Sequence, residues 1–418
     1  MIFIQKISKS EGNYIEYRVV ILDHAYSLMA PTHSVCVANN RGGVGKTFAT
    51  FQVACAAAYA EPEKKVLVID FSIYSHLSAM LLGGTAAKSA LSAPTGLQTC
   101  RSQTTADTRV EGLIRALDSV ASTGGKKRQG LFNFLGKGVS TEINLMDFAI
   151  QPSKFNVAIP SNLYLIASAG TPSWTRHNEA EVPLWCRSNE DWIGVAEHLR
   201  YSIDALPIDF DALFVDTDHL ASSVFTRLAL ATCDSVVVPC STDTADFQRL
   251  YETADAAQFN GVESLFTDVM MAMDRAGQLR ARVKCMFFAA VASVKNDPTT
   301  TTCGISLPFK PTISMMANMD CLAKMAYETC DKFPQYRMLF GIEYGMPSFE
   351  TFLGTVFSAS KMVPDLAKNI STLNGVPICG MTSQTYMAAN GLTGSSGVDV
   401  LDKLRTEINT LLGRIVKM

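Results

Sequence analysis

A glycine-rich run stands between two segments of contrasting character, and this arrangement constrains the fold more than any other feature of the chain. The run is RGGVGKT at 41–47; the apolar SVCVANN precedes it from residue 34, and the alanine-rich FATFQVACAAAYA follows it to residue 60. A second apolar run, KKVLVID, comes at 64–70. Strand, loop, helix and strand in so short a stretch form a βαβ unit, which predicts a parallel sheet with right-handed crossovers.

The glycine-rich run has the composition of a phosphate-binding loop. Glycines let the backbone wrap around phosphate oxygens, successive N–H groups form an anion-binding nest, and the following helix directs its positive end to the same place. In such a loop Lys46 contacts the β- and γ-phosphates and the Thr47 hydroxyl binds Mg²⁺. The usual first glycine is absent, and Asn40 stands there. The predicted cofactor-binding residues are Gly42, Gly43, Val44, Gly45, Lys46, Thr47 and Phe48.

Two aspartates end apolar runs that predict strands of the same sheet. Asp70 closes KKVLVID, and Asp216 closes ALFVD. The carboxyl ends of parallel strands lie at the ligand-binding edge of a sheet, where an aspartate is expected beside Mg²⁺. We therefore predict Thr47 and Asp216 as the metal-side residues. A capping or turn role is the alternative for either aspartate.

The remaining apolar runs complete an α/β prediction: a P-loop NTPase fold with a mostly parallel sheet flanked by helices, enlarged by insertions. Residues 1–33 form an N-terminal extension with a strand pair (YIEYRVVIL, 14–22) on the edge of the main fold, and residues 34–418 form one domain. Further strands are predicted at 162–170, 211–218, 234–243 and 282–293. Insertions are predicted near 84–160, 171–205 and 294–365, with an exposed basic loop, GGKKRQG, at 124–130.

Composition excludes several classes of protein. Of 418 residues, 48% are apolar and 18% are charged, which is ample for a buried core and argues against disorder. The formal charge of −3 supplies no global attraction to nucleic acid or acidic lipid, so any such contact requires a local patch. The chain start lacks the features of a signal peptide, no run is long enough to span a membrane, and eleven scattered cysteines without a CxxC pair indicate reduced, buried thiols. We expect a cytoplasmic protein.

Three segments resemble the ParA/MinD-type ATPases with a deviant Walker A motif. Residues 40–84, from NRGGVGKT onward, resemble their phosphate loop and the next strand; residues 210–250, from FDALFVDTD, resemble their Walker B strand and switch region. The strand NLYLIASAG and the closing helix VDVLDKLRTEINTLL are also similar. The resemblance implies ATP and Mg²⁺ as cofactors, a nucleotide sandwich dimer or filament, and the positioning or partition of DNA or other cargo. It also assigns catalytic roles to Lys46, Asp70 and Arg41.

The chain departs from this family pattern at three places. The signature lysine, which reaches the partner's phosphates across the dimer, is replaced by Arg41, and the second switch I aspartate is replaced by Ser72. Thr217-Asp218 stands where a proline pair often follows the Walker B aspartate. Because a serine cannot act as a carboxylate base, the slow ATPase activity that the resemblance implies is in question. The alternatives are a nucleotide-locked structural or filament protein with little or no hydrolysis, and a client-targeting ATPase.

The segments expected at the surface of the protein give a less specific prediction of partners than the glycine-rich loop gives of its ligand. Leucines and isoleucines recur at helical spacing in the closing helix, which predicts packing on the sheet, with a membrane-targeting tail or a self-association contact as alternatives. Non-specific DNA and a ParB-like protein are the further partners that the resemblance implies. Candidate DNA contacts are Lys126, Lys127, Arg128, Lys361 and Lys368. Methionines at 270–273 and 315–325 are predicted to fill the core, with a groove for hydrophobic clients as the alternative.

Overall fold

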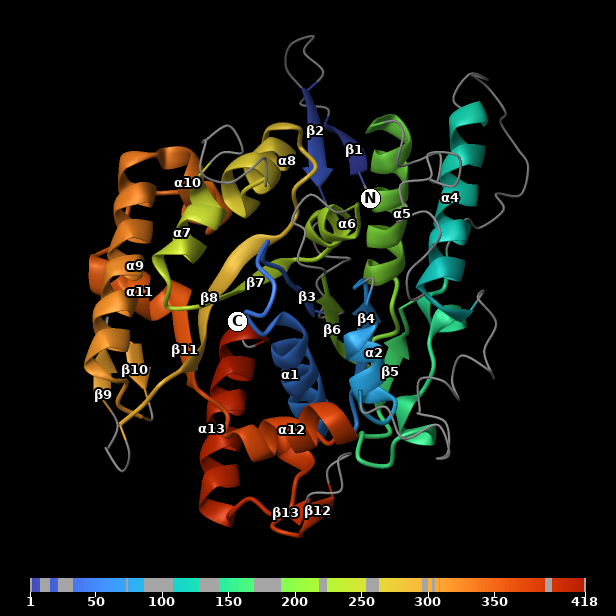
Figure 1. Cartoon of the computed structure of the whole chain (residues 1–418). Coiled ribbons are helices and arrows are strands. Elements are labelled where there is room, and N and C mark those ends of the chain that lie inside the picture. Colours follow the sequence, from blue (N-terminus) through green and yellow to red (C-terminus); the bar gives the residue numbers. More distant parts are fainter. Residues whose placement is uncertain are drawn as a thin grey trace.

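The computed structural model (Figure 1) describes most of the chain between the glycine-rich loop and the C-terminus. The described residues are 2–7, 16–21, 33–72, 74–85, 108–127, 143–168, 189–217, 224–252, 263–294, 300–302, 305–307, 309–387 and 393–416.

Seven parallel strands form the central sheet of the described chain. They are β3 (His33–Val37), β4 (Lys65–Asp70), β5 (Leu163–Ile166), β6 (Phe210–Asp216), β7 (Ser235–Cys240), β8 (Arg282–Val291) and β11 (Phe357–Lys361). Their order across the sheet is β11-β8-β7-β3-β6-β4-β5. The chain passes from β6 to β7 on the other side of β3, so the order reverses at the strand that precedes the glycine-rich loop. Such a reversal opens a crevice at the carboxyl edge of an α/β sheet.

Helices surround the sheet, and three short antiparallel strand pairs lie outside it (Figure 1). The helices are α1 (Lys46–Ala60), α2 (His76–Leu81), α4 (Val110–Lys127), α5 (Asn189–Asp204), α6 (Val224–Thr232), α7 (Thr244–Tyr251), α8 (Met271–Arg275), α9 (Ile313–Lys332), α10 (Pro334–Leu339), α11 (Phe349–Val356), α12 (Asp365–Asn374) and α13 (Val398–Ile415). The strand pairs are β1 (Ile2–Ile7) with β2 (Glu16–Ile21), β9 (Thr300–Thr302) with β10 (Ile305–Leu307), and β12 (Tyr386–Met387) with β13 (Thr393–Gly394).

Both faces of the sheet are buried, which explains why its strands are almost continuously apolar in sequence. Side chains alternate along β6: Leu213 and Val215 belong to one core with α4, α5 and α6, whereas Ala212 and Phe214 belong to the other with α1, α2 and α13. Six of the eight described cysteines are buried. Helix α1, which follows the glycine-rich loop, packs in the second of these cores on one face of the sheet and begins at the carboxyl edge of the sheet.

The predicted strands at 34–40, 64–70, 162–170, 211–218, 234–243 and 282–293 are confirmed as β3 to β8. The seventh strand, β11, lies within the stretch 294–365, which the sequence did not resolve into elements. The predicted loop at 124–130 is wrong at 124–127, because α4 continues through Lys127; residues 128–130 lie outside the described residues. Burial of Val110, Leu113 and Leu117 fixes α4 on the sheet, and extending a helix that is already nucleated costs little.

The closing helix packs against the rest of the chain. Leu411 and Ile415 of α13 belong to the core beneath α1, and Leu401 and Leu404 pack with α12. The predicted packing on the sheet therefore accounts for the apolar face, which leaves the membrane-tail alternative without an exposed stripe. Within the described residues, no helix combines the length and the apolar character that a membrane span requires.

Candidate nucleotide-binding site

Sheet register brings the glycine-rich loop and both strand-end aspartates to one place. β6 lies between β3 and β4, and Asp216 at its end is the partner of Val37 on one side and of Asp70 on the other. The loop begins just beyond Val37 and ends at Lys46, the first residue of α1. The phosphate loop, its lysine and the two carboxylates therefore share the carboxyl edge of three neighbouring strands.

The loop backbone requires glycine at two positions. Gly43 and Gly45 have φ angles of 79° and 89°, in the left-handed region that other residues rarely adopt. Gly45 is also the N-cap residue of α1, and among the described residues no side chain caps that helix. Its first N–H groups, together with the positive end of the helix dipole, are therefore available to an anion.

Two asparagines anchor the loop to the neighbouring β7–α7 region. The Asn39 amide donates to the Pro239 carbonyl over 2.6 Å, and its oxygen accepts from the Arg41 N–H over 3.0 Å. The Asn40 amide donates to the carbonyls of Arg249 and Glu263 over 2.7 and 3.0 Å. Asn40, which stands at the usual first-glycine position, therefore fixes the start of the loop through its side chain.

Lys46 and Thr47 are the first two residues of α1, at the end of the loop. The Lys46 side chain is largely buried, and its Nζ donates to the Arg41 carbonyl over 2.8 Å, inside the loop. The Thr47 hydroxyl donates to Asp216 Oδ2 over 2.8 Å, and the Thr50 hydroxyl donates to Asp216 Oδ1 over 3.2 Å. Burial, and secondly the nearby Asp70, raise the pKa of Asp216 to about 8, although Thr47, Lys46 and Thr50 oppose that shift.

Asp70 is held differently, by the loop that follows its own strand. Ser72 donates its N–H over 3.0 Å and its hydroxyl over 2.6 Å to one carboxylate oxygen. Ser78 donates its N–H over 2.8 Å and its hydroxyl over 2.6 Å to the other. Burial raises the pKa of Asp70, and these four hydrogen bonds oppose the rise. Ser72, which replaces the second aspartate of the family pattern, is thus a hydrogen-bond donor to the first.

Arg41 is paired within its own chain. Its guanidinium is hydrogen-bonded to the buried carboxylate of Asp246 and, over 2.9 Å, to the Ser241 hydroxyl. Asp243 lies 3.7 Å away. The hydrogen bond that Arg41 donates to Asp246 is the main cause of the raised pKa of Arg41. The arrangement ties the loop to the start of α7; the role of Arg41 across a dimer stays a prediction.

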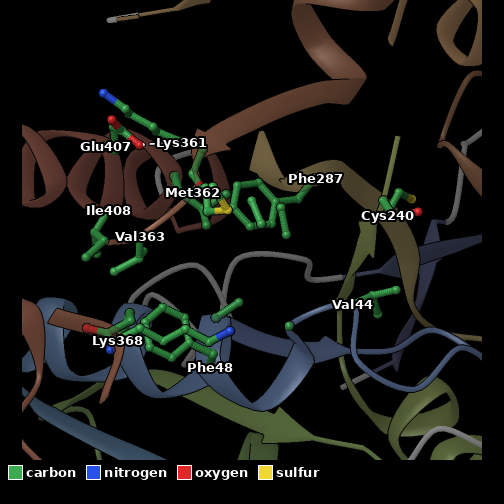
Figure 2. Close-up of a pocket in the computed structure, with 18 of the residues that line it drawn as sticks. Val44, Phe48, Cys240, Phe287, Lys361, Met362, Val363, Lys368, Glu407 and Ile408 are labelled. Carbon is green, nitrogen blue, oxygen red and sulfur yellow. Dashed lines mark hydrogen bonds between the residues drawn. The ribbon is translucent and has the colours of Figure 1, made fainter. Parts of the chain in front are cut away.

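A cavity of about 420 Å³ opens beside the loop (Figure 2), within the size range of small-molecule sites. Gly42, Gly43, Val44 and Gly45 form one part of its wall, and Phe48 continues that wall along α1. Most of the rest of its lining comes from β7, β8 and β11, and from α12 and α13. Lys361 and Lys368, which the sequence proposed as DNA contacts, line this cavity.

The sequence missed the residues that support the loop and those that close the cavity. Asp246, Phe287, Met362 and Glu407 carry no motif, and each comes from an element far from the loop in sequence. Spacing gives no signal for them. Of the lysines proposed for DNA, Lys126 and Lys127 lie in the last turn of α4, and Arg128 lies outside the described residues.

The residues present fit a magnesium nucleotide. Uncapped N–H groups and Lys46 provide the positive environment that phosphates need, and the Thr47 hydroxyl and Asp216 carboxylate are the oxygen ligands that Mg²⁺ prefers. Mg²⁺ would supply charge neutralisation on the phosphates. Thr47 and Asp216 already lie in contact, so both can serve one ion without a change in the fold.

Fold and loop together define the protein as a P-loop NTPase of the α/β class. The model of the CobQ/CobB/MinD/ParA nucleotide binding domain matches residues 35–260, more than half of the chain, so the chain belongs to this family. No curated protein matches the chain in a search of its sequence.

The solved structures to which the chain is similar come from several organisms. An ATP complex of an McdA variant from Cyanothece is 12% identical, covers 91% of this chain and 96% of its own, and has a TM-score of 0.49. The MinC:MinD cell division protein complex from Aquifex aeolicus is 12% identical over 91% and 96% of the two chains, with a TM-score of 0.39. A plasmid partition protein from Borrelia burgdorferi bound to AMPPNP is 15% identical over 64% and 78%, with a TM-score of 0.35.

Proposed function

We propose that this chain binds Mg-ATP at residues 42–47 and uses the bound nucleotide to control its own assembly, as a ParA-like partition or positioning protein. The contact between Thr47 and Asp216 beside the glycine-rich loop carries the proposal, because a threonine hydroxyl and a strand-end carboxylate are the residue types that bind Mg²⁺ next to such a loop. Assembly as a dimer or filament, slow hydrolysis, and DNA or another cargo as the partner follow from the family resemblance. The domain assignment proposed with it is 34–418, with 1–33 as an extension.

The first experiment measures ATP binding by Lys46→Ala, with Lys64→Ala as a matched control. Lys46 lies inside the loop, whereas Lys64 is exposed beyond the opposite end of α1. We expect Lys46→Ala to abolish binding of Mg-ATP and Lys64→Ala to keep the wild-type affinity. Full affinity in Lys46→Ala would remove the site assignment.

Assembly is tested by light scattering on a size-exclusion column with Mg-ATP, with Mg-ADP and without nucleotide. A mass that rises only with Mg-ATP supports a nucleotide switch. An identical mass in all three conditions contradicts it and leaves a static scaffold or a constitutive assembly.

A second function, a nucleotide-locked structural protein that hardly hydrolyses ATP, is favoured by the surroundings of Asp70. Its four hydrogen bonds come from Ser72 and Ser78, and no carboxylate stands at position 72 to act as a base. Ser72→Asp should raise phosphate release under this proposal, with Ser72→Asn as the uncharged control of similar size. Equal release from both variants would count against it.

The client-targeting alternative is not advanced. Met270, Met273 and Met319 are buried in the apolar core, and Met271 and Met315 pack against it; of these five, Met315 also lines the cavity beside the loop. The structure therefore favours core filling for the methionine-rich segments.

A further inference from the structure

The cavity beside the phosphate loop continues well beyond the loop. Figure 2 shows Val44 and Cys240 at one end, and Val363 and Ile408 at the other. If phosphates occupy the loop, as the proposed function holds, the rest of the nucleotide has to extend into this space. What lines the middle of the cavity therefore decides how a nucleobase is held.

An aromatic ring stands on each side of the middle of the cavity. In Figure 2, Phe48 on α1 lies across the space from Phe287 on β8, and Met362 at the end of β11 lies beside Phe287. Phe287 is almost fully buried, whereas Met362 is 55% exposed. The opposing wall is thus a fixed ring flanked by an adaptable thioether, and both are suited to contact with a flat π-system.

Phe48 is held in place by two apolar clusters. Its partly buried ring packs against the core that contains α1 and α13 and also against the smaller cluster between α12 and α13. Phe48 follows Thr47 directly in the chain, so its side chain is next in sequence to the residues proposed to bind Mg²⁺ and the phosphates. Gln52, one turn farther along α1, is engaged with the α12 side: its amide donates to the Ser371 hydroxyl over 2.6 Å, and its oxygen accepts from the Ile378 N–H over 2.9 Å.

We propose that Phe48, opposite Phe287 and Met362, forms a stacking slot for the nucleobase, so that Phe48 provides affinity for the base and none for the phosphates. The proposal rests on the proposed function, because the slot is a nucleotide subsite only if the loop binds phosphates. Stacking of a base on an aromatic side chain contributes a factor of about 5 to 150 in affinity. Such a contribution is confined to ligands that carry a base.

The experiment compares Mg-ATP with magnesium tripolyphosphate, which has the phosphates and lacks the base, by titration calorimetry. The variants are Phe48→Ala, which removes the ring, Phe48→Tyr, which keeps it, and Lys46→Ala, which removes the phosphate contact. We expect Phe48→Ala to weaken ATP by about 5- to 150-fold and to leave tripolyphosphate within twofold. Phe48→Tyr should restore ATP affinity, and Lys46→Ala should weaken both ligands.

Each other outcome overturns a distinct statement. Unchanged ATP affinity in Phe48→Ala, or equal weakening of both ligands, removes the stacking slot while leaving the phosphate site in place. Tripolyphosphate binding as tight as ATP in the wild type also removes it, because the base then contributes nothing. Failure of both ligands to bind the wild-type chain overturns the proposed function itself. Thermal unfolding without ligand, run on every variant, separates lost binding from lost folding.

Discussion

Asp70 and Asp216 occupy matching positions on neighbouring strands, but the hydrogen bonds that each receives come from different parts of the chain. Both carboxylates are fully buried. Asp70 receives four hydrogen bonds, all from Ser72 and Ser78 in the segment that follows its own strand. Asp216 receives two, both from threonine hydroxyls of α1 beside the phosphate loop.

The difference separates a carboxylate that anchors its own segment from one whose described donors are side-chain hydroxyls. Backbone N–H donors fix the chain that carries them, so Asp70 organises the turn from β4 into α2. That turn is tied down further by Ser168, which donates its hydroxyl to the Ser72 carbonyl and its N–H to Ser78 Oγ. Threonine hydroxyls can rotate toward another acceptor at little cost, so the Asp216 carboxylate can give up these two hydrogen bonds and accept a cation in their place. We infer that the number and kind of donors, more than burial, distinguish the two aspartates.

The largest effect is expected from Asp70→Ala. Removing the carboxylate leaves two N–H groups and two hydroxyls without their acceptor in a buried setting, which we expect to lower the free energy of unfolding by about 3–5 kcal/mol. Urea unfolding at pH 7.5 measures it, and Asp70→Asn should lose less because one acceptor oxygen remains. A loss below about 1 kcal/mol in Asp70→Ala would contradict the anchoring role.

Asp216→Asn should act in the opposite direction on stability. Without nucleotide, the asparagine removes a buried carboxylate whose ionisation burial and Asp70 oppose more than two hydroxyl donors and the Lys46 charge favour it, and we expect the free energy of unfolding to rise by about 2–3 kcal/mol. The same variant should lose the further stabilisation that Mg-ATP gives the wild type. Thermal unfolding with and without Mg-ATP tests both statements. A variant that is destabilised like Asp70→Ala would make the two aspartates equivalent.

Local sequence patterns were sufficient to predict six of the seven strands of the described sheet, and they gave the residues proposed for the phosphate end of the site. Continuous apolar runs marked β3 to β8 because both faces of a parallel sheet are buried, and the spacing of Lys46, Thr47 and Asp216 follows from one loop and one strand end. The glycines at 43 and 45 were readable for the same reason, since their backbone angles exclude other residues.

The other half of the site depends on contacts between distant segments. Phe287, Met362 and Glu407 reach the cavity only because β11 pairs with β8 and α13 packs on α1. None of these pairings leaves a local signal in sequence. The donors to Asp70 show the same limit: Ser72 looked like a lost carboxylate, and only the structure shows that it is a partner of Asp70.

Glu407, another buried carboxyl group, extends the comparison to a carboxylate with one backbone donor. On α13, its Oε2 accepts from the Lys361 N–H at the end of β11 over 2.8 Å. Burial raises the pKa of Glu407 to about 7, with that hydrogen bond and the Lys361 charge opposing. The folded protein therefore holds this proton at pH values where the unfolded chain has lost it.

The sign of the pH dependence follows from that difference. Because the pKa of Glu407 is raised in the folded state, its contribution to stability is complete below about pH 4.5 and is lost as the pH rises through about 7. Glu407→Gln keeps an acceptor for Lys361 and removes the titration. Between pH 5 and pH 7.5 the wild type should lose about 1–2 kcal/mol more stability than the variant, measured by urea unfolding at both pH values. Equal losses would mean that the single backbone donor of Glu407 already keeps its carboxylate ionised in the folded protein. The difference between Asp70 and Asp216 would then need a cause other than the number of hydrogen-bond donors.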